Sequence, residues 1–97
     1  MIRAIAFHPA AVIEVEEAEA WYAAERGDLA DAFVADMEAT VARVATNPLA
    51  WTERSPGVRQ AQLRRFPYIV VFRLRGETVE VVAVAHGHRA PRYWSRR

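Results

Sequence analysis

The sequence predicts an α+β fold in which a pair of helices packs on one face of a mostly antiparallel, twisted sheet. In residues 9–47, apolar side chains recur every three or four positions, the spacing of a buried helical stripe. In residues 58–85 they recur at every second position, the spacing of half-buried strands. A short apolar run, Ile2–Phe7, is predicted to be a first strand, which makes the order β-α-α-β-β-β. Because 97 residues suffice for one core, residues 1–97 are predicted to form a single domain.

The two predicted helices form an antiparallel hairpin, because only about two residues join them. Pro9 suits the first turn of the first helix, where its missing N–H costs nothing. Gly27 is placed to end that helix, Asp28 is placed to cap the second helix, and Asn47-Pro48 ends the second helix. The predicted buried stripes are Ala11, Val15, Ala18 and Tyr22 in the first helix and Leu29, Phe33, Met37, Val41 and Val44 in the second.

Three further strands are predicted at Val58–Arg65, Tyr68–Arg75 and Thr78–Ala85. The connection Gly76-Glu77, with glycine first, is typical of a type II′ hairpin turn. Alternation along the last two strands assigns a helix-facing set, which is Tyr68, Val70, Phe72, Leu74, Val79, Val81, Ala83 and Ala85. The opposite set is Ile69, Val71, Arg73, Arg75, Glu80, Val82, Val84 and His86. Only the C-terminal tail remains to cover that opposite face, so we expect an exposed, half-apolar binding surface there.

Charge divides the chain into an acidic and a basic half. Residues 1–53 carry ten acidic residues and three arginines, a net charge of −7. Residues 54–97 carry ten arginines and two acidic residues, a net charge of +8, which suits nucleic acid or an acidic partner. The acidic run from Glu14 to Glu19 lies on a predicted helix and is expected to be a solvated surface.

Composition disfavours several classes of protein. No apolar run approaches the roughly 20 residues that span a membrane, and the first residues lack a secretion signal, so a cytoplasmic protein without membrane contact is expected. The absence of cysteine excludes disulfides and sulfur ligands. His8, His86 and His88 have no acidic residue at ligand spacing, so neither a metal site nor a cofactor is predicted.

The chain end, Val84–Arg97, is the richest source of functional side chains. It contains two histidines, four arginines, a tyrosine and a tryptophan after an apolar strand. Arginine binds phosphates and carboxylates, aromatic rings stack on bases or apolar anchors, and histidine exchanges protons near neutral pH. This composition indicates a contact surface.

Motifs along nearly the whole chain resemble a known family. They are, in order, Phe7-His8-Pro9-Ala10-Ala11, Trp21-Tyr22, Phe33, Asn47-Pro48, Val58-Arg59, Arg65-Phe66-Pro67-Tyr68 and Val84-Ala85-His86-Gly87-His88-Arg89-Ala90-Pro91-Arg92-Tyr93-Trp94. Together they resemble the RelE/ParE superfamily, the toxins of bacterial type II toxin–antitoxin pairs. The resemblance implies the strand and helix order predicted above. It also implies a cognate antitoxin, encoded alongside, whose C-terminal segment wraps the toxin and blocks it, so a hetero-oligomer is expected.

The superfamily divides by target. RelE-like members cut messenger RNA in the ribosomal A site, whereas ParE-like members inhibit DNA gyrase. The RelE-like catalytic arginines would fall near Tyr68 or Ile69 and near Gly87 here, and no lysine is present to form the RelE-like lysine pair. Only Tyr93 has a RelE-like counterpart. The form Phe66-Pro67-Tyr68 is similar to the ParE-like branch, which favours a gyrase inhibitor that acts by binding.

Each alternative function uses its own set of residues. A RelE-like ribosome-dependent nuclease would need a proton acceptor, a proton donor and cations over the phosphate, and its candidates are His86, His88, Arg59, Arg65, Arg89 and Tyr93. Predicted antitoxin-binding residues are Ile69, Val71, Arg73, Val82, Val84 and Trp94. Predicted target-binding residues are Arg64, Arg92, Arg96 and Arg97. A third alternative is a small nucleic-acid-binding domain with no toxic role.

Overall fold

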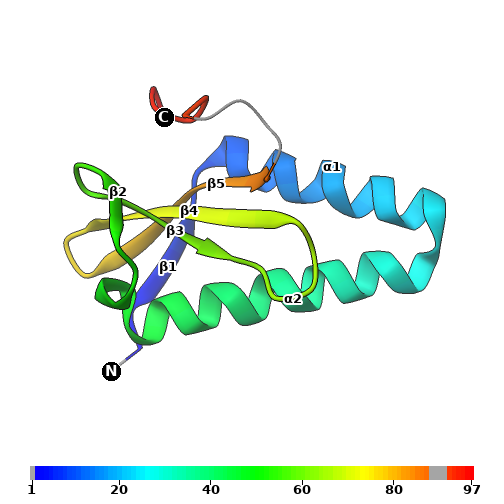
Figure 1. Ribbon diagram of the computed structural model, residues 1–97, viewed down its shortest axis with the longest axis horizontal. Helices are drawn as coiled ribbons and strands as arrows, with labels where there is room; N and C mark the ends of the chain where they lie inside the picture. Colours follow the sequence, from blue (N-terminus) through cyan, green and yellow to red (C-terminus); the bar gives the residue numbers. More distant parts are fainter. Residues whose placement is uncertain (1, 88–91) are drawn as a thin grey trace.

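The computed structural model describes residues 2–87 and 92–97 and has two layers, a helical hairpin and a mixed sheet (Figure 1). The elements along the chain are β1 (Ala4–Phe7), α1 (Pro9–Glu25), α2 (Gly27–Thr46), the 3-10 helix η1 (Pro48–Ala50), β2 (Glu53–Ser55), β3 (Val58–Gln62), β4 (Tyr68–Arg75) and β5 (Thr78–His86). Within the described residues the strand order is β1-β5-β4-β3-β2, with β1 parallel to β5 and every other pair antiparallel. The predicted fold class is confirmed. No helix in this part of the chain combines the length and the apolar character that crossing a membrane requires.

The helical hairpin turns through one residue. α1 starts at Pro9 and α2 ends at Thr46, as predicted. Gly27 does not end α1 and Asp28 does not cap α2, because Arg26 is the cap residue of both helices. The φ angle of Arg26 is −170°, and its N–H donates to the last turn of α1. Since any residue adopts such extended backbone, the turn requires no glycine and the two predicted caps were wrong.

The main core lies between the helices and the sheet. The predicted helical stripes are buried there, except for the half-buried Val15, Tyr22 and Leu29. The largest fully buried side chains on the helix side of the sheet are Phe33, Val44, Val70, Phe72, Val79, Val81 and Val84. An aromatic group closes one end of this core, since the Phe33 ring centroid lies 5.5 Å from that of Tyr22 and 5.0 Å from that of Tyr68. Such ring pairs add to the stability that burial of apolar area provides.

A β-bulge interrupts the pairing of β4 with β5. Val71 pairs with Ala83 and Phe72 pairs with Val81, so Val82 is the extra residue. A bulge places two residues of one strand opposite one residue of its partner, and therefore reverses the alternation of side chains beyond it. The predicted faces are correct from Thr78 to Val82 and wrong after Val82.

The reversal changes which residues each face of the sheet carries. Val84 joins the main core and the His86 ring lies 5.1 Å from the Tyr68 ring on the helix side, although both were predicted on the opposite face. Ala83 and Ala85, predicted in the main core, lie instead in a second apolar cluster on the opposite face. The sequence pattern does not reveal the bulge, because residues 81–85 are all apolar and small enough for either face.

The remaining strand boundaries show one confirmation and two differences. Gly76 has a φ angle of +60° and is followed by Glu77, whose φ is not positive, as a type II′ turn requires. The predicted strand Val58–Arg65 ends early, at Gln62. The short strand β2, Glu53–Ser55, was not predicted and pairs with β3.

The early end of β3 results from a buried carboxylate on α2. Asp36, which is 8% exposed, accepts hydrogen bonds from the N–H groups of Arg64, Arg65 and Phe66 at 3.2, 2.8 and 3.2 Å. These N–H groups therefore bind α2 rather than a neighbouring strand. The contact fixes the β3–β4 loop on the helical hairpin.

We predict that Asp36→Ala lowers the free energy of unfolding by about 3 kcal/mol, because it leaves several buried N–H donors without an acceptor. Urea denaturation followed by circular dichroism measures the change. Glu38→Ala, an exposed position on the same helix, is the control and should change stability by no more than about 0.5 kcal/mol. Equal stability of the two variants would contradict the structural role of Asp36.

Candidate functional site

Within residues 2–87 and 92–97, no strand pairs with the outer side of the second half of β5. β1 pairs with β5 from Thr78 to Val81 only, since β1 ends at Phe7 and the chain turns into α1. Beyond that point the edge of β5 is covered by side chains. The Val84 N–H donates to Glu14 Oε1 at 2.9 Å, and Arg97 Nη1 donates to the Val82 carbonyl at 3.1 Å.

Glu14 is the centre of this arrangement. Arg97 donates to both of its carboxylate oxygens, Nη1 to Oε1 at 3.0 Å and Nη2 to Oε2 at 3.1 Å. The Tyr93 hydroxyl donates to Oε2 at 2.6 Å. Only 11% of the Glu14 side chain and 20% of the Arg97 side chain are exposed, so this bidentate pair is protected from water. Glu14 joins α1, β5 and the C-terminal tail.

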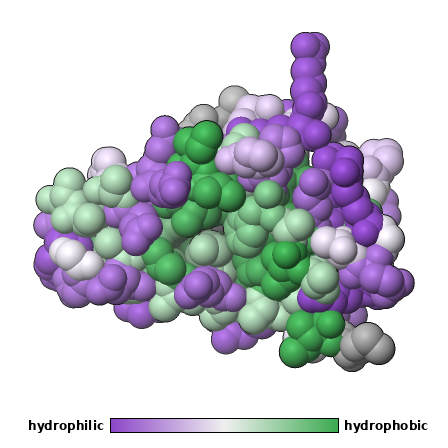
Figure 2. Space-filling view, turned by 180° about the vertical axis from the view of Figure 1, so that it is seen from behind, coloured by the Kyte–Doolittle hydropathy of each residue, from purple (hydrophilic) through white to green (hydrophobic). Residues whose placement is uncertain are grey.

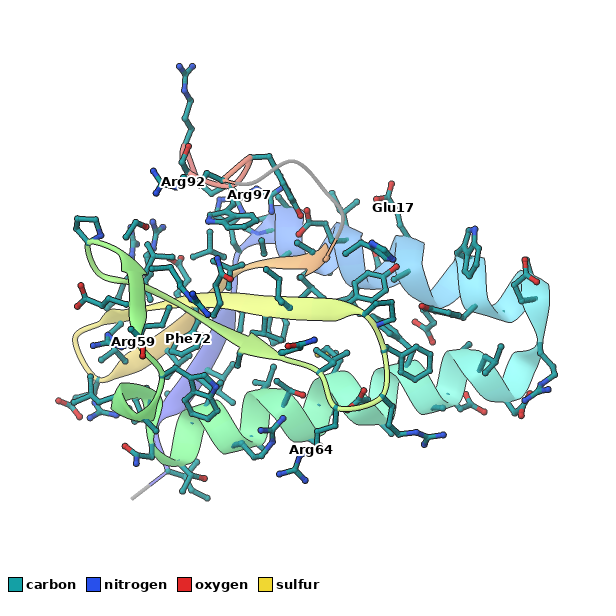
Figure 3. The ribbon with its side chains drawn as sticks, viewed as in Figure 1. Glu17, Arg59, Arg64, Phe72, Arg92 and Arg97 are labelled. Atoms are coloured by element: carbon teal, nitrogen blue, oxygen red, sulfur yellow. The ribbon has the colours of Figure 1, made fainter. Side chains whose placement is uncertain are left out.

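The expectation that Glu14 belongs to a solvated surface was wrong. Its exposed neighbours Glu16, Glu17 and Glu19 do follow that expectation. Figure 3 shows Glu17 pointing away from the body of the protein on α1. Glu14 differs because Arg97, which lies 83 residues further along the chain, returns to it. No local pattern predicts a contact of that sequence separation.

The C-terminal tail, residues 92–97, covers the sheet face opposite the helices. Trp94 is 7% exposed and forms the second apolar cluster with Val71, Val82, Ala83 and Ala85. The Arg97 guanidinium lies 5.1 Å from the centre of the Tyr93 ring, and Arg73 Nη2 donates to the Arg97 carbonyl at 3.2 Å. The tail is therefore held by apolar packing and by charge.

This cover corrects the prediction of a bare sheet face. Val71, Val82 and Trp94 are buried against one another, and Val84 faces the helices. Ile69 is half-buried, and Arg73 forms an ion pair with Glu80. Antitoxin contact with these six residues stays a prediction, and it would require the tail to move for most of them.

The candidate nuclease residues within the described part of the chain do not gather at one place. His86 borders a hollow of about 190 Å³ that is also lined by Glu14, Glu17, Trp21 and Tyr68. Tyr93 is bound to Glu14. Arg59 and Arg65 lie elsewhere. His88 and Arg89 fall outside the described residues.

The two arginines that lie elsewhere have their own surroundings. Arg59 Nε donates to the Trp51 carbonyl at 2.7 Å, and its guanidinium lies 3.5 Å from Glu53, so Arg59 ties β3 to β2. Figure 3 shows Arg59 at the β2 side of the sheet, away from the tail. Arg65 is exposed in the β3–β4 loop, where its N–H binds Asp36.

The predicted target-binding arginines are also divided. Arg92 and Arg96 are exposed on the tail, and Arg92 has a φ angle of +64°, a left-handed conformation that costs free energy in a residue other than glycine. Arg97 is held by Glu14. Arg64 extends beyond α2, on the opposite side of the molecule from Arg92 and Arg97 (Figure 3). Within the described residues, no group of three or more metal-ligating side chains is present.

Comparison with known proteins agrees with this architecture. A helical hairpin on one sheet face and an arginine-rich tail on the other make this a small two-layer α+β protein. The family model described as the ParE toxin of the type II toxin–antitoxin system, parDE, matches residues 5–91, and the chain belongs to that family. A solved structure from the chromosomal ParDE toxin–antitoxin system of P. aeruginosa shares the fold, with a TM-score of 0.77, 19% sequence identity and coverage of 88% of this chain and 96% of that chain. A search of curated proteins gave no match.

We predict that Glu14→Ala lowers the free energy of unfolding by about 2–3 kcal/mol, because it leaves the Val84 N–H without its acceptor and removes both carboxylate acceptors of the Arg97 guanidinium. It should also speed tryptic cleavage after Arg92 and Arg96, which mass spectrometry detects. Glu17→Ala, on the exposed side of the same helix, is the control. Identical cleavage rates in the two variants would show that Glu14 does not hold the tail.

Proposed function

We propose that this ParE-family protein stops growth by binding DNA gyrase, and that a cognate antitoxin neutralises it. Family membership supports the toxin role. The observation that favours binding over RNA cleavage is that the polar groups of Arg59 and Tyr93 are bound within the chain, to Trp51 and Glu14 respectively. The Arg59 guanidinium, which a nuclease would aim at a phosphate, here ties β3 to β2.

The exposed part of the tail is the proposed contact with gyrase. Arg92 and Arg96 are exposed, while on the same segment Trp94 is buried and Arg97 is half-buried, and these two residues fix its position. A segment that is fixed at two positions presents its remaining side chains without a large loss of conformational entropy on binding. The net charge of +8 in residues 54–97 would attract an acidic partner.

RNA cleavage is the second candidate, and one observation favours it. The hollow beside His86 is lined by two carboxylates and two aromatic rings, Glu14, Glu17, Trp21 and Tyr68, a set suited to stacking on a base. If His86 exchanged protons with a ribose bound there, toxicity would depend on it.

We predict that expression without antitoxin arrests growth and induces the SOS response while cellular messages stay intact, because trapped gyrase leaves broken DNA. RNA sequencing and an SOS reporter measure the two effects in the same culture. Purified protein should inhibit DNA supercoiling by gyrase. The double variant His86→Ala with His88→Ala should keep its toxicity.

Two results would overturn the proposal. Messages cut at ribosomes, together with loss of toxicity in the folded histidine variant, would establish the nuclease instead. Harmless expression and no effect on supercoiling would favour the third alternative, a nucleic-acid-binding domain without toxic action.

We predict that Arg92→Ala with Arg96→Ala raises the concentration needed to inhibit gyrase by about tenfold, since two exposed charged contacts contribute roughly 0.7 kcal/mol each. The thermal midpoint should not change, because both side chains are exposed. The matched control is Arg54→Ala with Arg75→Ala, which removes the same charge from exposed positions outside the tail. Equal inhibition by both double variants would exclude the tail as the gyrase contact.

A further inference from the structure

A polar hollow of about 300 Å³ lies between the C-terminal tail and the β2–β3 turn, and we call it the tail hollow. Arg73 of β4 and Arg92 of the tail line it, together with the hydroxyl-bearing Ser55 and Ser95. No acidic side chain is among the described residues that line it. Guanidinium and hydroxyl groups donate hydrogen bonds to anions, so the lining has the chemistry of an anion site.

The floor of the tail hollow is apolar and fixed by packing. It is formed by Val58 of β3, Val82 of β5 and Trp94 of the tail. Val82 and Trp94 are buried in the second apolar cluster, and Trp94 is 7% exposed. Since Arg92 and Ser95 lie close to Trp94 in the chain, the packing of Trp94 sets their place at the hollow. Charge-assisted hydrogen bonds are stronger over such an apolar floor than in open water.

Three irregularities of the backbone meet at the tail hollow. Val82 is the extra residue of the bulge in β5, and Ser55 follows a shift in the register of β2 with β3. Arg92 has the left-handed φ angle of +64°. Bulges and left-handed residues other than glycine interrupt regular structure and are concentrated at functional sites. Their coincidence in three separate segments indicates a binding site.

One guanidinium of the lining has no counter-charge. Arg73 forms an ion pair with Glu80, and its Nη2 donates to the Arg97 carbonyl at 3.2 Å. Glu80 also lies 3.4 Å from Arg75, which is outside the lining. Arg92 forms no ion pair among the described residues. A ligand with one negative charge would therefore balance Arg92.

A larger apolar groove along β1 does not have this chemistry. Two adjoining hollows of about 430 and 220 Å³, which share Phe7 and Met37, form that groove where β1, α1 and α2 meet. Figure 2 shows hydrophobic side chains gathered around a hollowed region on this side of the molecule. Its charged lining residues are Glu38 and Glu16, and no described arginine lines it. An anion is therefore attracted to the tail hollow and not to the groove.

We propose that the tail hollow binds one aspartate or glutamate side chain of the target protein. The carboxylate accepts hydrogen bonds from Arg92 and from the hydroxyls of Ser55 and Ser95, while the methylene groups of the ligand contact the apolar floor. The anion site follows from the geometry of the hollow, whereas the identity of the target as gyrase rests on the proposed function.

The floor favours an acidic protein segment over nucleic acid. Sites for single-stranded nucleic acid combine a positive groove that follows the backbone with exposed aromatic rings that stack on bases. Trp94, the aromatic residue of this lining, is almost fully buried and offers no ring face for stacking. A planar carboxylate, in contrast, matches the fork of the Arg92 guanidinium.

The first test keeps the charge and removes the fork. The probe is a tetraglutamate peptide with blocked ends, and binding is followed by the NMR signal of the Trp94 indole N–H. Arg92→Lys should weaken binding by about fivefold, because lysine cannot donate two parallel hydrogen bonds to a carboxylate. Arg54→Lys, exposed and outside the lining, is the control and should change the Kd by no more than about 1.5-fold. Equal effects of the two substitutions would overturn the site.

The second test places a carboxylate of the chain itself in the hollow. Ser55→Asp should weaken binding of the peptide on the order of tenfold, since it occupies the place of the ligand and repels it. Thr52→Asp introduces the same charge at an exposed position outside the lining and should have no more than about a twofold effect. Circular dichroism confirms that both variants fold. Equal weakening would show a general charge effect and overturn the site.

A nucleic acid probe tests the other source of anions. A thymidine tetranucleotide should shift the Trp94 signal only at higher concentrations than the peptide does. Tighter binding of the tetranucleotide, with the same sensitivity to Ser55→Asp, would overturn the proposal in favour of a nucleic acid site.

Gyrase separates failure of the site from failure of the proposed function. Ser55→Asp should raise the concentration needed to inhibit supercoiling, and Thr52→Asp should not. If the peptide binds as predicted but the unaltered protein does not inhibit gyrase, the toxic mechanism fails while the anion site stands. If the unaltered protein inhibits gyrase but does not bind the peptide, or if both variants inhibit gyrase equally, the tail hollow is not the contact for an acidic side chain.

Discussion

The short pairing of β1 with β5 is the constraint on which the functional surfaces depend. β1 contributes four residues, and the second half of β5 would expose its backbone groups without other partners. Glu14 accepts from the Val84 N–H, and Arg97 donates to the Val82 carbonyl. One carboxylate on α1 thus completes a strand edge and holds the chain's last residue in the same contact. Because one carboxylate makes both contacts, loss of Glu14 would expose the edge of β5 and release the tail together.

The β-bulge at Val82 complements that contact. The extra residue turns Ala83 and Ala85 away from the helices and gives Trp94 an apolar bed on the opposite face. It also turns Val84 into the main core. Packing and ion pairing consequently act at the same place, and the tail is held at Trp94 and Arg97 while Arg92 and Arg96 are left exposed.

The protein has two surfaces of different character. The tail presents arginines, and the groove along β1 presents apolar side chains bordered by Glu16 and Glu38. Helix α1 contributes to both, since Glu14 binds the tail and Val12 lines the groove. Helix α1 therefore joins the groove to the tail.

Much of the architecture follows from the sequence by itself. The helical stripes, the order of elements, β4, the Gly76 turn and the division of charge depend on residues near one another in the chain, so periodicity and turn chemistry predict them. Three features required the tertiary structure. The bulge leaves no mark in an all-apolar strand, Glu14 is distinguished from its acidic neighbours only by a distant arginine, and the groove exists only where β1, α1 and α2 meet. Each depends on groups far apart in the chain, whose contacts are set by how the layers pack.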